Sequence, residues 1–293
     1  MQPDALTLAR SIQETALIEL RDGEFAEIAD IMQREARIFL PETKHTLVHS
    51  RLTKRLRHLG LRTFDSYVQR VRSDAAERAF MVEALTTNHT HFFREAHHFS
   101  HLKTALLPRL KANALAGKPV RIWSAGCSSG EEVYTIAMCL LGADRAESLW
   151  ARQGQVKLLA TDIAPAVVEA VRRAEYPAAA ADAVPPAYRA VWMEQRGDNF
   201  TMAPEVRGLV QANVLNLFDP CPMRHKYDAI FCRNVMIYFD DKAKAELISR
   251  LVDLLQPGGY LFIGHSERLV GEGARVMQRS AQTCFMKPHD CVA

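Results

Sequence analysis

VRIWSAGCSSGEE, residues Val120 to Glu132, carries the clearest structural pattern in the sequence. It opens with a largely apolar run that predicts a buried strand, continues through small residues, and enters an apolar helical pattern at Glu131. Strand, glycine-rich turn and helix form the opening unit of nucleotide-binding α/β folds, where glycines let a ligand approach the backbone at a helix N-terminus. The stretch therefore predicts an α/β domain with a ligand site at this turn.

The residues of the turn indicate which ligand fits. No Lys-Ser or Lys-Thr pair follows the last glycine, so the turn is not a P-loop. The negative charges of Glu131 and Glu132 interact favourably with the N-terminal end of the helix dipole, but they would repel a phosphate. A nucleoside with hydroxyls and a positive centre fits better, and S-adenosylmethionine, with its ribose and sulfonium, is such a ligand. An ordinary βα turn with an acidic first helical turn stays open as the alternative.

The composition is that of a globular protein with one large or two ordinary domains. The chain has 293 residues, of which 48% are hydrophobic and 24% charged, and its net charge is +3. This charge gives no overall attraction to nucleic acid or membrane. No apolar run approaches the ~20 residues of a membrane span, and the N-terminus lacks the apolar core of a signal peptide. Six cysteines without a CxxC pair indicate free thiols, so we expect a cytoplasmic protein without membrane insertion.

The pattern along the chain predicts three parts. Residues 1–95 have apolar positions at helical spacing and predict an all-helical domain, whereas alternating strand and helix patterns predict an α/β domain over 119–293. Residues 96–118 are expected to be a linker, because 111–119 are rich in Ala and Gly. Residues 176–213 interrupt the alternation and predict an inserted short helix and small antiparallel sheet, after which a strand is expected at 214–217.

Two segments carry many cationic or imidazole side chains. The amphipathic segment 47–61 presents basic residues with no acid among them, which indicates either a solvated face or a dock for an acidic helix or a nucleic acid. Residues 86–102, TTNHTHFFREAHHFSHL, contain five histidines, and His97 and His101 are one helical turn apart. Because no HExxH is present and no Cys or Asp completes a ligand set, we expect no metal site.

Polar residues follow two further predicted strands. Asp162 comes directly after the strand 156–161, in the position where doubly wound folds hold ribose hydroxyls, although it also suits a helix start. The strand 227–232 ends at RNVMIY, residues 233–238. Because catalytic residues of open α/β sheets gather at such strand ends, this loop is a second candidate for the site.

Several motifs, taken together, resemble one known family. TTNxTxFFREAHHF, SxGCSSGEE, ATDI, FCRNVMIYF and GHSE occur here in an order similar to that of the bacterial chemotaxis receptor methyltransferases, the CheR family. The resemblance spans residues 25 to 287. It implies an all-α N-terminal domain and a Rossmann-like class I S-adenosylmethionine methyltransferase domain with an inserted β-subdomain. It further implies methylation of glutamates on the cytoplasmic helices of chemoreceptors, giving methyl esters and S-adenosylhomocysteine.

The resemblance also implies roles for individual residues. Arg94 and Tyr238 would flank the transferring methyl group. The residues that would bind the cofactor are Asn88, Thr90, Arg94, Glu132, Asp162, Asn216, Leu217, Asn234 and Val235. Those that would meet the receptor are Arg51, Lys54, Arg55 and Arg57. Residues 194–208, EQRGDNFTMAPEVRG, have fewer glycines than the loop with which some members bind a receptor's C-terminal tail, so the resemblance does not extend to tethering by a tail.

The chemistry of glutamate methylation needs little from the protein. A glutamate with a pKa of about 4.3 is already a nucleophilic carboxylate at neutral pH, so no general base is required. Alignment with the methyl group and removal of water are required instead. Arg94 is expected to orient the carboxylate through its forked donors, and Tyr238 to donate a hydrogen bond.

Three other functions fit parts of the sequence. An RNA or base methyltransferase would suit the basic segment, but Arg233-Asn234-Val235 differs from the Asn/Asp-Pro-Pro-aromatic motif of enzymes that methylate base amino groups. A non-catalytic adaptor that senses S-adenosylmethionine would not need Arg94 and Tyr238. A Rossmann dehydrogenase would have to place its pyrophosphate against Glu131 and Glu132. We therefore expect a methyltransferase that acts on protein and not on nucleic acid.

Overall fold

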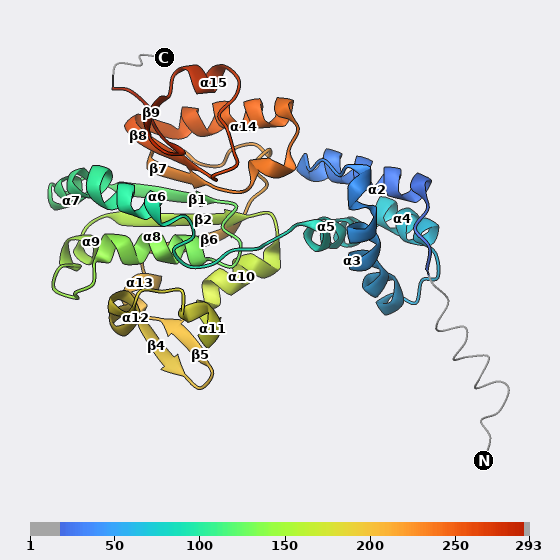
Figure 1. Ribbon diagram of the computed structural model, residues 1–293, viewed down its shortest axis with the longest axis horizontal. Coiled ribbons are helices and arrows are strands. Elements are labelled where there is room, and N and C mark those ends of the chain that lie inside the picture. Colours follow the sequence, from blue (N-terminus) through green and yellow to red (C-terminus); the bar gives the residue numbers. More distant parts are fainter. Residues whose placement is uncertain (1–17, 290–293) are drawn as a thin grey trace. The chain divides into compact units, whose positions relative to one another are not determined.

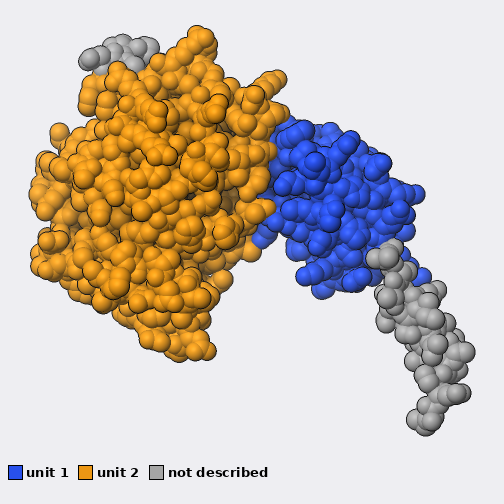
Figure 2. Space-filling model, in the orientation of Figure 1, with its two compact units in different colours: residues 1–86 blue, residues 87–293 orange. Residues whose placement is uncertain are grey.

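The structure, a computed structural model, describes residues 18–289 and divides the chain into two compact units at Thr86 and Thr87 (Figure 2). The boundary therefore lies before the position expected at residue 95. Residues 87–95 belong to the second unit because they bond to it: Ser128 Oγ donates to the Asn88 carbonyl at 2.9 Å, and the Phe93 amide donates to Thr135 Oγ1 at 3.2 Å. Residues 1–17 of the expected helical domain, and Cys291, lie outside the described residues.

The first unit is helical. Its α-helices are α2 (Asp22–Ala36), α3 (His45–His58), α4 (Phe64–Ser73) and α5 (Ala75–Leu85). Side-chain caps define two helix starts, since Thr63 accepts from the Ser66 amide and Asp74 accepts from the amides of Ala76 and Glu77. The apolar positions that predict these helices form the core, and the fully buried ones include Ile28, Met32, Val48, Leu52 and Leu56.

The basic face of α3 has an acidic partner on α5. The Arg55 guanidinium donates to both carboxylate oxygens of Glu77, at 2.9 and 2.6 Å, and Glu77 is buried. Arg55 also lies over the Phe80 ring, 3.9 Å from its centroid. Arg51 donates to the carbonyls of Leu85 and Thr86, where α5 ends, at 2.9 and 2.6 Å. Two of the four basic residues expected to meet a receptor therefore hold the unit together.

The second unit is built on a seven-stranded sheet (Figure 1). The strands, in spatial order, are β6 (Val210–Val214), β2 (Val156–Asp162), β1 (Val120–Ala125), β7 (Tyr227–Cys232), β8 (Leu255–Ile263), β10 (Cys284–Met286) and β9 (Gln278–Ala281). The first five pair in parallel, whereas β10 pairs antiparallel with both neighbours. From β1 the chain adds β2 and β6 on one side, and from β7 it adds β8 on the other side. This change of direction places a ligand crevice at the carboxyl ends of β1 and β7.

Helices cover both faces of this sheet. Chain order runs from β1 through α8 (Glu131–Leu141) to β2, and through α10 (Pro165–Arg173) to β6; α14 (Asp241–Leu254) joins β7 to β8. Because right-handed crossovers that run in opposite directions along a sheet lie on opposite faces, α8 and α10 cover one face and α14 the other. The predicted α/β class is confirmed, the strand 227–232 has its predicted bounds, and the helix predicted to begin at Glu131 begins there.

The linker expected at 96–118 is wrong. Residues 96–115 form helical turns, named α6 (Ala96–His101), the π-helical η2 (Leu102–Leu106) and α7 (Leu107–Leu115). Phe99, Leu102, Leu106 and Leu110 recur at helical spacing and are buried in the same core as α8. The alanines that suggested a hinge are strong helix formers, so composition alone was misleading here.

The inserted β-subdomain is present but ends earlier than expected. Its antiparallel sheet has the order β3 (Glu175–Pro177), β5 (Asn199–Met202) and β4 (Met193–Arg196), with the short helices α11 (Ala178–Ala181), α12 (Pro186–Trp192) and α13 (Pro204–Arg207) beside it in the chain. Residues 210–214 belong to the main sheet, where they pair with β2, so the strand expected at 214–217 was placed too late. This edge strand, VQANV, is largely exposed, and its apolar residues alternate with Gln211 and Asn213 instead of forming a continuous apolar run.

Across residues 18–289, no helix combines the length and the apolar character needed to cross a bilayer.

The Arg55–Glu77 ion pair is expected to stabilise the first unit. We expect Glu77→Ala to lower the free energy of unfolding by about 2–3 kcal/mol, because it leaves a largely desolvated guanidinium without its carboxylate. Urea unfolding followed by circular dichroism measures the change. Glu83→Ala on the same helix is the control, with an expected loss below about 0.5 kcal/mol. The double variant Arg55→Met/Glu77→Met should regain most of the loss, and an unaltered Glu77→Ala midpoint would contradict the assignment.

Candidate active site

The glycine-rich turn lies against the ends of two other strands. The amides of Gly126 and Cys127 both donate to the Thr161 carbonyl in β2, at 2.8 and 2.9 Å. Gly126 has a φ of +78°, and a Cβ built on it would overlap the Val235 side chain in the loop after β7. The turn therefore needs glycine at 126 both for its backbone conformation and for the close approach of Val235.

Asp162 ends β2 and is buried beside this turn. Its Oδ2 accepts from the Ser128 amide at 2.9 Å, and its Oδ1 accepts from the Ala164 amide at 3.1 Å, directly before α10. Burial raises the pKa of this carboxyl, and the backbone donors oppose that shift. Each oxygen keeps a further lone pair, so Asp162 both braces the turn and can accept from ligand hydroxyls.

Glu132 is held by two partners from neighbouring strands. Its Oε1 accepts from Ser124 Oγ at 2.7 Å, and its Oε2 accepts from Arg233 Nη1 at 3.0 Å. Arg233 Nη2 donates to the Arg94 carbonyl and lies 3.5 Å from Glu95 Oε2. The side chain of Arg233 is 2% exposed, so this guanidinium joins three segments from within the protein. The sequence interpretation gave Arg233 no role, although it quoted the motif that contains it.

Residues 87–94 run beside the turn and the loop after β7. Phe92 is buried, and Arg94, half-buried, donates from Nη1 to the His89 carbonyl at 2.9 Å. The Tyr238 hydroxyl donates to the Thr87 carbonyl at 3.4 Å. The structure thus brings Arg94 and Tyr238 to the main chain of one segment. In the same segment, the Asn88 side chain is exposed and Thr90 is half-buried.

The loop 233–238 is held by Glu267, which the sequence interpretation also missed. The Glu267 carboxylate accepts from the amides of Asn234, Gly264 and Ile237 at 2.9, 2.6 and 3.3 Å. Asn234 has a φ of 60°, a left-handed conformation that the bonds to Glu267 help to fix. Burial raises the pKa of Glu267, with the backbone donors acting against it. The GHSE motif after β8 was the available signal.

Asn216 and Leu217 lie in the loop after β6. The amide of Leu215 donates to the Asp162 carbonyl at 2.9 Å, which brings this loop to the end of β2. Both residues line an apolar pocket of about 190 Å³ together with Trp123 and Leu251. Sites for whole ligands measure roughly 300–1,000 Å³, so this pocket could take one ring of the expected cofactor at most.

The carboxylates at the glycine-rich turn fit a cationic nucleoside better than a phosphate. Glu131, Glu132 and Asp162 all lie at the turn, and Ser129 Oγ donates to Glu131 Oε2 at 2.7 Å. Cys127 is buried, and burial raises the pKa of its thiol well above the ordinary value, so the thiol stays protonated. The structure therefore supports carboxylate recognition of hydroxyls and positive charge here, and it gives Cys127 no nucleophilic role.

The contact between the turn and Val235 makes a prediction. Gly126→Ala should lower the free energy of unfolding by about 2–4 kcal/mol, because it combines overpacking with a strained positive φ. Thermal denaturation measures the loss. The companion variant Gly126→Ala/Val235→Ala should regain only the part of the lost free energy that overpacking causes, because the strain of the positive φ remains. Equal stability of Gly126→Ala and the unmodified chain would show that the turn can relax.

Comparisons with known proteins identify the family of the chain. A family model described as CheR methyltransferase, SAM binding domain, matches residues 88–285, and one described as CheR methyltransferase, all-alpha domain, matches residues 23–86. The chain is 43% identical over 259 residues to a probable chemotaxis protein methyltransferase of Rhizobium etli, covering 86% of this chain and 94% of the relative.

Two further relatives are chemotaxis protein methyltransferase 2 of Pseudomonas aeruginosa and a chemotaxis protein methyltransferase of Escherichia coli. Both are 37% identical to this chain, over 89% and 87% of it and over 92% and 88% of the respective relatives. The chain therefore belongs to the CheR methyltransferase family and is an S-adenosylmethionine-dependent methyltransferase, with an all-α domain that precedes a domain of the class I fold in the sequence.

Proposed function

We propose that this enzyme methylates glutamate side chains on the cytoplasmic helices of chemoreceptors, giving glutamyl methyl esters and S-adenosylhomocysteine, and that it acts in the cytoplasm. The observation that carries the proposal is the joining of three segments at one site. Arg233 and Ser128 tie residues 87–94 to the glycine-rich turn and to the loop after β7. The names of the relatives, chemotaxis protein methyltransferases, support a receptor as the substrate.

The cofactor contacts are proposed as follows. Asp162 accepts from the ribose hydroxyls with the lone pairs that the backbone leaves free. Glu132 places negative charge near the amino acid or sulfonium part of the cofactor. Asn216, Leu217, Asn234 and Val235 line the adenosyl part, and Asn88, Thr90 and Arg94 close the site from the segment before it. Bound S-adenosylmethionine supplies the electrophilic methyl group.

The acceptor contacts follow from charge. The incoming glutamate is ionised at neutral pH and needs a positive partner that does not protonate it. Arg94 is half-buried, and its guanidinium can turn from the His89 carbonyl to a carboxylate. Tyr238 presents a hydroxyl beside the same segment. Both groups orient the nucleophile in a partly desolvated site, and neither needs to remove a proton.

Among the basic residues of α3, those that are exposed are the ones proposed to meet the receptor. Lys54 and Arg57 are exposed, whereas Arg51 and Arg55 bond within the helical unit. We therefore assign the electrostatic attraction of an acidic receptor helix mainly to Lys54 and Arg57. The role of Arg51 and Arg55 in this recognition is to hold α3 against α5.

Substitutions at the acceptor side and at the cofactor side of the site should affect different constants, kcat and Kd respectively. Arg94→Ala is expected to lower kcat about 100-fold with a small change in cofactor affinity, because it removes orientation of the acceptor. Asp162→Ala should raise the Kd of S-adenosylhomocysteine about 10- to 100-fold, because it removes charged hydrogen bonds to the ribose. Calorimetry measures Kd, and methyl transfer measures kcat. Cys127→Ala is the control and should change neither; an unaltered kcat in Arg94→Ala would remove Arg94 from the chemistry.

The nature of the product tests the proposed substrate. Tritiated methyl transfer to receptor cytoplasmic fragments should give label that mild base releases as methanol, because glutamyl esters are base-labile. Fragments with the acceptor glutamates changed to alanine should take up no label. Base-stable label, or label on RNA and none on the fragments, would contradict the proposal and favour a base methyltransferase.

A further inference from the structure

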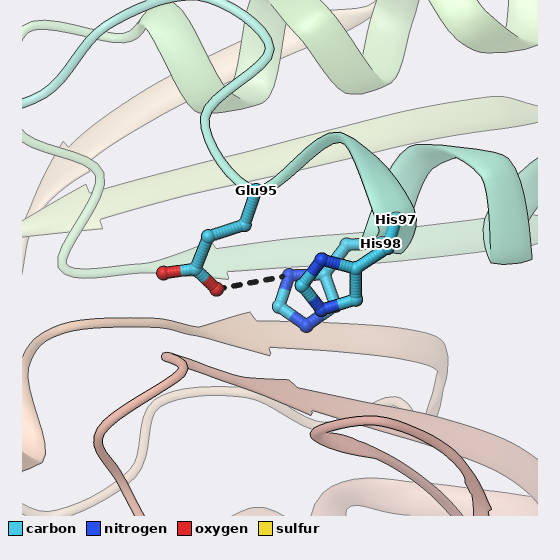
Figure 3. A group of neighbouring side chains, drawn as sticks. All are labelled: Glu95, His97 and His98. Atoms are coloured by element: carbon cyan, nitrogen blue, oxygen red, sulfur yellow. Dashed lines mark ion pairs between the residues drawn. The ribbon is translucent and has the colours of Figure 1, made fainter.

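A cluster of three possible metal ligands lies behind the active-site segment. It consists of Glu95, which precedes α6, and His97 and His98 in the first turns of that helix (Figure 3). One ligand atom from each residue lies within 4.8 Å of the other two. The sequence expectation of no metal considered His97 with His101 and did not include Glu95. In the structure, His101 Nε2 instead bonds Ser280 Oγ at 3.0 Å.

Two of the ligand atoms face each other without other hydrogen-bond partners. Glu95 Oε2 and His98 Nδ1 are both buried and, within residues 18–289, have no hydrogen-bond partner; they lie 3.5 Å apart (Figure 3). Two ligands that are 2.0–2.1 Å from a tetrahedral ion are about 3.4 Å from each other. The observed separation is therefore already the one that a shared metal ion requires, whereas it is long for a hydrogen bond.

The other side of the two rings fixes their protonation. Thr283 Oγ1 donates to the Gln282 carbonyl at 2.8 Å, and it lies 2.7 Å from His98 Nε2 and 3.3 Å from His97 Nε2. With its one proton directed to the Gln282 carbonyl, the hydroxyl accepts from Nε2 of both rings. In this arrangement each Nδ1 is left unprotonated. A histidine that donates its other N–H to a fixed acceptor is the usual arrangement around a bound metal.

The charges near the cluster are compatible with a cation. The Arg233 guanidinium lies 3.5 Å from Glu95 Oε2 but is shared with Glu132, so two carboxylates accompany one cation. The other oxygen of this carboxylate, Glu95 Oε1, lies 3.0 Å from Nδ1 of the exposed His265, which leaves Oε2 for the ion.

We propose that Glu95, His97 and His98 form a site for one divalent transition-metal ion of the Zn²⁺ class. Two imidazoles and one carboxylate favour Zn²⁺, Co²⁺ or Ni²⁺ over Mg²⁺ and Ca²⁺, which prefer sets made only of oxygen ligands. Thr283 orients the two rings from behind. The site is distinct from the proposed cofactor contacts, and its occupancy does not depend on whether the enzyme acts on a receptor.

Titration of the full-length, metal-free protein with Co²⁺ tests this site. A Cys221→Ser background removes the one exposed thiol of residues 18–289 as a competing ligand. We expect one Co²⁺ per chain, the visible absorption of a four- or five-coordinate ion, displacement by Zn²⁺ and no displacement by excess Mg²⁺. His97→Gln and Glu95→Gln should each weaken binding at least tenfold. His101→Gln, on the same helix, is the matched control and should bind as the background does.

Absence of stoichiometric Co²⁺ binding would overturn the proposal, as would equal binding by His97→Gln and the background. Equal weakening by His101→Gln would show binding elsewhere on the histidine-rich helix and would also overturn it. X-ray absorption of the Zn²⁺-loaded background protein keeps the test independent of variant folding. Two imidazoles with oxygen ligands are expected, and fewer than two imidazoles would contradict the assignment.

Discussion

The active site depends on the burial of one positive charge. Arg233 follows β7 with its side chain almost fully enclosed, and a buried guanidinium is tolerated only where anionic or carbonyl groups surround it. Glu132 from α8, Glu95 from the segment before α6 and the Arg94 carbonyl supply those groups. Removing either α8 or the segment that carries Arg94 and Glu95 would leave part of this charge unsatisfied. The pairing of Arg233 therefore fixes where residue 94 lies relative to the glycine-rich turn.

Two buried carboxylates of the site are likewise surrounded by groups that bond to them. Asp162 and Glu267 are both buried, and backbone amides of neighbouring loops bond to each of them. These bonds fix the loops after β1 and β7 without using a hydrophobic contact. They also concentrate negative charge at the carboxyl ends of the strands, which suits a ligand with a sulfonium and disfavours one with a pyrophosphate.

Local patterns predicted most of the fold, and long-range pairings account for what they missed. The run after Lys226 and the apolar helix from Glu131 have clear periodicity, so their bounds could be predicted. Residues 96–115 were misjudged because composition was weighed above the spacing of Phe99 and Leu102. The partner of Arg55, and the roles of Arg233 and Glu267, depend on residues 22, 101 and 33 positions away, which no local pattern contains.

The division between buried and accessible groups bears on how the enzyme meets its substrate. Arg94 and Tyr238 are half-buried and bond only to main-chain carbonyls of residues 87–89 by the contacts described above, whereas Arg233, Asp162 and Glu267 are buried and bonded within the protein. Under the proposed function, a receptor glutamate displaces a carbonyl from Arg94 without disturbing the buried pairs. Because buried charges and backbone amides hold the loops around Arg94 and Tyr238, the proposed site is preorganised, which favours alignment of the substrate.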